Sequence, residues 1–168
     1  MSILVRRISR AKWDNAVKDD DGLFDVDADA ITNCLKTTDN TLSVWEIDDE
    51  SKLDEAILAL TTGKKQEQFS KIDFVLIDEN MLKDKGLLLV NSDGDTVINF
   101  LIKKHRNISS LSYKKLGIMK DIILYCINNE KHKFKTKREI IQIVKEAIDS
   151  GALQKSTLNE KLIENEKL

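Results

Sequence analysis

The sequence predicts an α/β or α+β fold: a small mixed sheet of about four strands, with packed helices and a helical C-terminal third. Two observations predict it. Over the first ~100 residues, short apolar segments rich in β-branched and aromatic residues alternate with helical patterns, as in a sheet covered by helices. Beyond residue 103, apolar residues recur at helical spacing and capping residues precede them. A chain of 168 residues, 41% of them hydrophobic, can bury a substantial core.

Four segments are expected to form the strands. Residues 3–8 and 41–47 are enriched in β-branched and aromatic side chains, which suit a pleated surface. Residues 73–78 are a short apolar run between two acids, which favours a buried strand. Residues 87–90 follow a glycine and are again apolar. These segments are short enough for strands and too short for core helices of typical length.

Helices are expected between and after these strands. Asp29 is a suitable N-cap for a short helix at residues 30–35, and Ser51 with Asp54 forms a variant of the capping box. Gly151 stands where a glycine stop belongs, after a strongly amphipathic segment. Three helices are expected in the C-terminal third, and their predicted caps are Ser109 or Ser110, Thr136 with Glu139, and Thr157 with Glu160.

Charge divides the chain into two parts. Residues 1–102 carry 12 Lys and Arg against 21 Asp and Glu, a net charge of −9, whereas residues 103–168 carry 15 against 8, a net charge of +7. We therefore expect an acidic domain of alternating strands and helices at residues 1–102 and a basic helical segment at residues 103–168 that packs on it as one unit. The electrostatic field of two oppositely charged parts either recruits a charged partner, nucleic acid included, or docks the two parts on each other.

Basic side chains are densest between Lys103 and Arg138, with eleven Lys and Arg and only two acids. If residues 109–165 form three helices, loosely like a helix-turn-helix, this region would contact nucleic-acid phosphates. Lysine at this density is, however, more often a solvated or internally paired surface. The residues expected to bind a protein partner or nucleic acid, which we name the basic face, are Lys103, Lys104, Arg106, Lys133, Lys135, Lys137 and Arg138.

An acidic loop is the second candidate surface for a partner. Asp25, Asp27 and Asp29 have the initial spacing of an EF-hand calcium loop, but Ala30 and Lys36 stand where that motif needs Gly and Glu. No metal and no cofactor are therefore expected. A hydrated loop, a site for a basic partner and a mimic of phosphates all remain open. The predicted binding residues of the acidic loop are Asp19, Asp20, Asp21, Asp25 and Asp27.

Enzymatic activity has no motif to support it. His105 and His132 lie among lysines, without the carboxylate or second ligand that a general base or metal ligand normally has nearby. Glu50 and Lys52 form a Glu-x-Lys pattern that is expected by chance in a chain one-third charged. The glycines lack phosphate-loop spacing. The two cysteines lack metal-ligand spacing and predict buried free thiols in a reduced cytosol.

The segments Ala28 to Thr32, Thr41 to Trp45, Gly94 to Thr96 and His105-Arg106 together resemble small bacterial proteins with no known activity, and this resemblance assigns no site. We expect a non-enzymatic, cytoplasmic bacterial protein that binds a protein partner through charged surfaces, such as an accessory, immunity or antitoxin-like factor. A nucleic-acid-binding regulator is the first alternative, and a metal-dependent enzyme using N-terminal carboxylates is the second. No apolar run approaches the roughly 18 residues of a membrane span, so no membrane partner is expected.

Overall fold

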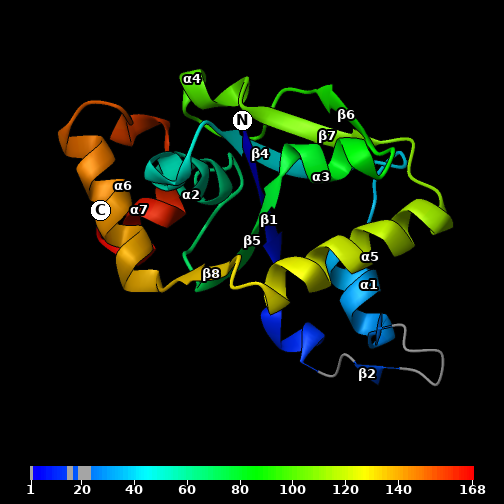
Figure 1. Cartoon of the computed structure of the whole chain (residues 1–168). Coiled ribbons are helices and arrows are strands. Elements are labelled where there is room, and N and C mark those ends of the chain that lie inside the picture. The colour runs from blue at the N-terminus through cyan, green and yellow to red at the C-terminus, as the bar shows by residue number, and fades with distance from the viewer. Residues whose placement is uncertain (1, 15–16, 19–23) are drawn as a thin grey trace.

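The computed structural model describes residues 2–14, 17–18 and 24–168, and in this part of the chain six strands pair in one antiparallel sheet. The strand order is β6-β7-β4-β1-β5-β8 (Figure 1). A separate pair is formed by β2 (Val17–Lys18) and β3 (Phe24–Asp25). The strands of the main sheet are β1 (Ile3–Ile8), β4 (Leu42–Ile47), β5 (Ile72–Asp78), β6 (Leu88–Asn91), β7 (His105–Ser109) and β8 (His132–Lys135).

The predicted fold class is confirmed, and the four expected strands match β1, β4, β5 and β6. The expectation of about four strands in a mixed sheet is wrong, because β7 and β8 add two more and every pairing is antiparallel. Both added strands lie in the segment that was expected to be helical. They are short and largely polar, so pairing with β4 and β5, rather than an apolar pattern of their own, determines their conformation.

Helices cover both faces of the sheet (Figure 1). Short 3-10 turns, η1 (Arg10–Trp13), η2 (Glu50–Lys52) and η3 (Lys155–Thr157), connect the elements. One face packs against α1 (Ala28–Cys34), α3 (Glu79–Asp84) and α5 (Tyr113–Asn128). The other packs against α2 (Leu53–Thr61), α4 (Asn99–Ile102), α6 (Lys137–Asp149) and α7 (Glu160–Glu166).

The period-two alternation of the central strands separates these two cores. On β5, Phe74 and Leu76 belong to the core beneath α2 and α6, whereas Val75 and Ile77 belong to the core beneath α1 and α5. All four side chains are at most 3% exposed, so β5 is buried on both faces. This explains why its sequence is a continuous apolar run rather than an alternating one.

The C-terminal helices do not form the compact trio that a helix-turn-helix would need. Strand β8 separates α5 from α6, and the two helices pack on opposite faces of the sheet. The helix-turn-helix interpretation is therefore wrong. Among the described residues, no helix is both long enough and apolar enough to cross a membrane.

One predicted capping box is confirmed: Thr136 and Glu139 satisfy each other's backbone N–H groups at the start of α6. Gly151 follows α6 with φ +77°, as a glycine stop requires. Other predicted caps lie a few residues from the observed ones. Asp49 caps η2 in place of Ser51, and Ser112 caps α5 in place of Ser109 or Ser110. Asn159 caps α7 in place of Thr157, and Asp29 lies inside α1.

Gly94 is required by close packing near β7. A methyl group added there would overlap Trp45 Cη2 and would lie 2.7 Å from Trp45 Cζ3 and 2.8 Å from His105 Cβ. We expect Gly94→Ala to lower the free energy of unfolding by about 2 kcal/mol through overpacking, as measured by urea denaturation. Gly117→Ala in α5 is the matched control: its added methyl meets open space, so stability should rise by about 0.5–1 kcal/mol. Equal effects of the two substitutions would contradict this packing argument.

Candidate functional site

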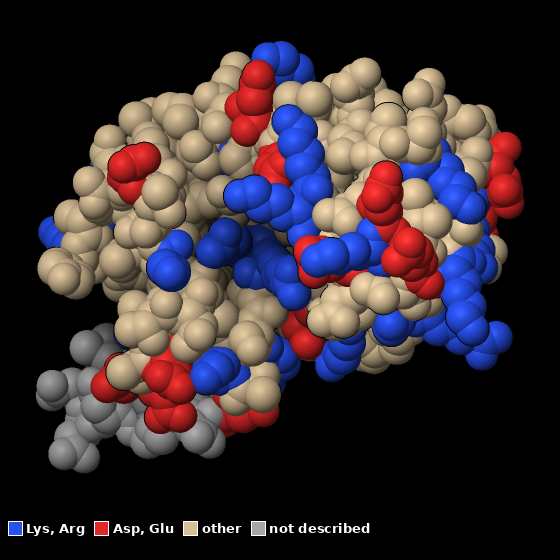
Figure 2. All heavy atoms as spheres, turned by 180° about the vertical axis from the view of Figure 1, so that it is seen from behind, with Lys and Arg blue, Asp and Glu red and all other residues tan. Residues whose placement is uncertain are grey.

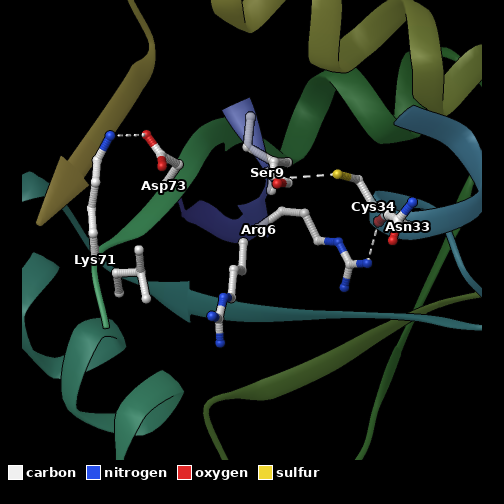
Figure 3. Close-up of a pocket in the computed structure, with 9 residues that line it drawn as sticks. Arg6, Ser9, Asn33, Cys34, Lys71 and Asp73 are labelled. Atoms are coloured by element: carbon white, nitrogen blue, oxygen red, sulfur yellow. Dashed lines mark hydrogen bonds and ion pairs between the residues drawn. The ribbon is translucent and has the colours of Figure 1, made fainter. Parts of the chain in front are cut away.

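A basic cleft opens where β1 and β4 separate. The two strands pair only from Ile3 to Val5 of β1; beyond Val5, β1 continues beside β5 while β4 continues beside β7. The Arg6 side chain bridges the separation, and Figure 3 shows it extending from β1 toward Cys34. Its Nη1 donates to the Ser43 carbonyl of β4 at 2.7 Å, and its Nη2 donates to the Cys34 carbonyl at the end of α1 at 2.5 Å. One guanidinium thus satisfies carbonyl groups of two elements at the opening.

Arg6 retains an unsatisfied donor. Its Nε is fully buried and has no hydrogen-bond partner among the described residues, although most buried polar groups in proteins have one. Burial lowers the pKa of the Arg6 guanidinium, and the nearby Cys34 partly opposes this effect. An arginine remains protonated despite such a shift, so the cleft holds a fixed positive charge that water solvates only in part.

The cleft has a volume of about 340 Å³. Figure 2, which views the molecule from behind Figure 1, shows a hollow in and around which Lys and Arg side chains gather, in agreement with the cleft's composition. The lining residues come from β1, the turn after it, the end of α1 and the start of β5. They are Arg6, Arg7, Ile8, Ser9, Asn33, Cys34, Lys71, Ile72 and Asp73.

Positive charge predominates in this lining. Arg7 is exposed and forms no ion pair with any described residue. Lys71 Nζ lies 3.3 Å from Asp73 Oδ1 and 4.7 Å from the centre of the Phe134 ring. The same Asp73 oxygen also contacts His132 Nε2 at 3.0 Å. The cleft therefore contains three permanent cations and one carboxylate, and that carboxylate is already engaged by two partners.

Cys34 connects the segments that line the cleft through three hydrogen bonds. Its sulfur accepts hydrogen bonds from the Ser9 backbone N–H at 3.1 Å and from Trp13 Nε1 at 3.3 Å, while its carbonyl accepts from Arg6. The prediction of buried free cysteines is confirmed for both residues. Cys126 lies elsewhere, on the buried face of α5, where burial raises the pKa of its thiol to about 11.

The residues of the predicted basic face are not brought together. Lys103, Lys104 and Arg106 lie in or just before β7, whereas Lys133 and Lys135 lie on the edge strand β8, with β4, β1 and β5 between the two strands. Lys133 and Arg138 form no ion pair with any described residue. The other five are paired with acids of the chain itself: Lys103 with Asp93 (2.6 Å), Lys104 with Asp48 (3.3 Å), Arg106 with Glu46 (2.6 Å), Lys135 with Asp54 (3.6 Å) and Lys137 with Glu166 (2.8 Å).

The acidic loop is described only in part, because Asp19, Asp20 and Asp21 lie outside the described residues. Asp25 accepts a hydrogen bond from the Val26 backbone N–H, and Asp27 is the residue before α1. In the described ranges, no group of three or more His, Cys, Asp or Glu side chains is arranged to hold a metal ion.

The two histidines lie in different surroundings, and His105 is not on the surface. This residue is buried on β7, and its ring packs edge-on against Trp45 with 5.0 Å between the ring centres. Burial lowers the pKa of His105. His132 instead pairs with Asp73 beside the cleft.

Sequence reasoning missed the cleft residues Arg6, Arg7 and Lys71. One signal could have indicated them: two consecutive arginines interrupt the otherwise apolar segment of β1, where burying a charge is costly unless it has a purpose or a partner. No family model matches the chain, and no curated protein or solved structure shows significant similarity to it.

Proposed function

We propose that the chain is a non-enzymatic, cytoplasmic binding protein whose basic cleft recognises a phosphate-bearing ligand. The observation that carries the proposal is the position of Arg6: a partly desolvated guanidinium bridges β1 and β4 and lines the cleft. Arg7 and Lys71 add two cations at the same opening. An anion entering the cleft would meet three positive side chains, and Asp73 is the one acidic side chain among the lining residues that offsets them.

A phosphate group matches this donor set better than a carboxylate does. Guanidinium groups recognise phosphate through several parallel N–H···O bonds, and a phosphate offers three oxygens to donors that approach from different directions. Arg6, Arg7 and Lys71 approach the cleft from different backbone positions on β1 and just before β5. The cleft volume lies at the lower end of the range typical of small-ligand sites, which suits one phosphate with part of the group that carries it.

The proposal keeps the hypothesis of a charged binding surface but assigns that surface to different residues. Most members of the basic face already pair with acids from the first 102 residues or with Glu166. A cation held in such a pair must give up its partner before it binds another anion, so it contributes less affinity. Arg7 has no such competitor among the described residues.

Arg7→Ala tests the proposal most directly, because Arg7 is exposed and its removal should change stability by less than about 0.5 kcal/mol. We expect its affinity for inorganic phosphate and for adenosine monophosphate to fall about tenfold, because one charge-assisted hydrogen bond contributes roughly 1.5 kcal/mol. Isothermal titration calorimetry measures this loss.

Lys145→Ala is the matched control, since Lys145 is an exposed lysine of α6 outside the cleft that pairs with no acid in the described part of the chain. It should bind both ligands as the wild type does. Failure of the wild-type protein to bind either ligand, or an Arg7→Ala affinity equal to that of wild type, would refute the proposed function.

A further inference from the structure

We infer that the β6 edge of the sheet is a self-association surface, on which β6 of a second copy of this chain pairs in antiparallel register about Leu89. The pairing joins the two six-stranded sheets into one continuous sheet. This inference goes beyond the proposed function and does not depend on it, since no residue of β6 lines the basic cleft. Three observations carry it: an open backbone edge, an exposed apolar side chain on that edge, and opposite charges at the two ends of the strand.

The two edge strands of the sheet differ in how they discourage pairing with another chain. Strand β8 reads HKFK, and lysines on an edge strand oppose the approach of a further strand. Strand β6 reads LLVN and carries no charge. It ends the sheet on the side away from β8, and no described strand pairs with its outer side (Figure 1). Of the two edges, β6 is therefore the one suited to strand addition.

The pairing of β6 with β7 leaves the backbone groups of alternate residues pointing outward. The Ser92 N–H donates to the His105 carbonyl of β7 at 3.4 Å, in the same register as the rest of this strand pair. Because hydrogen-bonded pairs recur at every second residue of an antiparallel pair, the N–H and C=O groups of Leu89 and Asn91 point away from β7. These groups form the open edge, and an added strand supplies both donors and acceptors to them.

A two-fold axis at Leu89 matches this edge with itself. In that register Leu89 exchanges hydrogen bonds with Leu89 of the second copy, and the Asn91 N–H of each chain reaches the Leu87 carbonyl of the other. Leu88 then lies opposite Val90 of the second copy, in a pair without hydrogen bonds whose side chains approach closely. Leu88 is 52% exposed and Val90 is half-buried, so the pairing covers apolar surface on both chains.

The charges that flank β6 select a second copy of the same strand as its partner. Lys85 precedes Leu89 by as many residues as Asp93 follows it. Two-fold antiparallel pairing therefore brings the Lys85 end of each strand to the Asp93 end of the other, and attraction arises twice. Lys85 is exposed and pairs with no acid of the described chain. Asp93 is also exposed, and the lysine that it contacts, Lys103, is on the surface as well, so Asp93 remains accessible to a further cation.

Sedimentation equilibrium on the full chain tests the inference. Two four-residue strands bury less than the ~1,200 Å² of a stable interface, so we expect a weak dimer with a Kd in the micromolar range. The chain should be monomeric at about 5 μM and largely dimeric at about 500 μM. Amide hydrogen exchange at Leu89 and Asn91 should slow over the same range, because pairing protects the outward N–H groups.

Leu88→Lys should raise the Kd at least about tenfold, since it replaces the exposed apolar side chain of β6 with a charge that opposes strand addition. Phe134→Lys is the matched control: Phe134 is also 52% exposed, and it lies on the other edge strand. It should leave the Kd unchanged. Urea denaturation of both variants shows that they are folded at the concentrations compared.

Two charge reversals test the register. Lys85→Glu and Asp93→Lys should each raise the Kd about tenfold at low salt, because both symmetry-related contacts become repulsive. An equimolar mixture of the two variants should associate as tightly as the wild type, since every contact in the mixed dimer again joins opposite charges. A chain that stays monomeric at about 500 μM would overturn the inference. So would equal Kd values for Leu88→Lys and Phe134→Lys, or a mixture that associates no more tightly than its components.

Discussion

Arg6→Ala should lower the free energy of unfolding by about 3 kcal/mol and should abolish measurable phosphate binding. The substitution leaves the Ser43 and Cys34 carbonyls without the donor that now joins them, and a hydrogen bond to a charged group contributes roughly 1.5–3 kcal/mol. It also removes one of the three cations that line the cleft. Urea denaturation measures the first effect, and calorimetry with inorganic phosphate on the still-folded variant measures the second.

Arg6→Lys separates geometry from charge at the same position. A lysine retains the positive charge but cannot reach two carbonyls with a planar fork, so we expect a loss of about 1.5 kcal/mol and a residual affinity for phosphate. Arg7→Ala, at the adjacent position, should weaken binding without this loss of stability. If Arg6→Ala unfolds at the same urea concentration as the wild type, the bridge between the strands contributes nothing and our account of the cleft is incorrect.

Glu166→Ala should be the second most damaging substitution, at about 2–3 kcal/mol. The Glu166 carboxylate is buried; its Oε1 accepts from the Phe69 backbone N–H at 2.8 Å, and its Oε2 lies 2.8 Å from Lys137 Nζ. Alanine would leave a buried N–H without a partner and would uncouple α7 from the segment that leads into β5. We expect hydrogen exchange to increase throughout α7, together with a lower urea midpoint.

Two variants of α7 serve as controls for this effect. Glu166→Gln keeps an oxygen for Phe69 and loses only the ion pair with the half-exposed Lys137, so it should cost about 1 kcal/mol or less. Glu164→Ala removes an exposed acid from the same helix and should cost less than about 0.5 kcal/mol. A Glu164→Ala effect as large as that of Glu166→Ala would attribute the loss to helix propensity rather than to the buried contact.

The fold was predictable where local sequence agrees with tertiary structure. The β5 segment is apolar on both faces and short, and the Thr136 box is satisfied entirely within one helical turn, so neither needs a distant partner to be identified. Strands β7 and β8 were not predictable in this way. Their sequences, HRNIS and HKFK, acquire strand geometry from β4 and β5, which lie roughly 60 residues earlier in the chain.

The site was less predictable than the fold, because counting charges does not show which charges are paired. Lys104 and Arg106 belong to the most basic segment, yet Asp48 and Glu46 of the acidic segment neutralise them. Arg6 and Arg7 lie within the acidic segment, whose net charge stays negative despite them, so a count of charges does not point to them. Their importance follows from the separation of β1 from β4, which is a property of strand pairing and not of composition.

The position of β7 and β8 on either side of the central strands has a consequence for synthesis of the chain. Strands β4, β1 and β5 all lie within the first 78 residues, but their neighbours on each side are supplied only after residue 104. Until then a nascent chain presents β4 and β5 with unpaired edges, which are templates for association with other chains. Pairings across such long separations also close slowly. Folding of this protein should therefore be completed late, after the C-terminal third has left the ribosome. The yield of folded protein should depend on how well the edges of β4 and β5 are shielded from other chains before that moment.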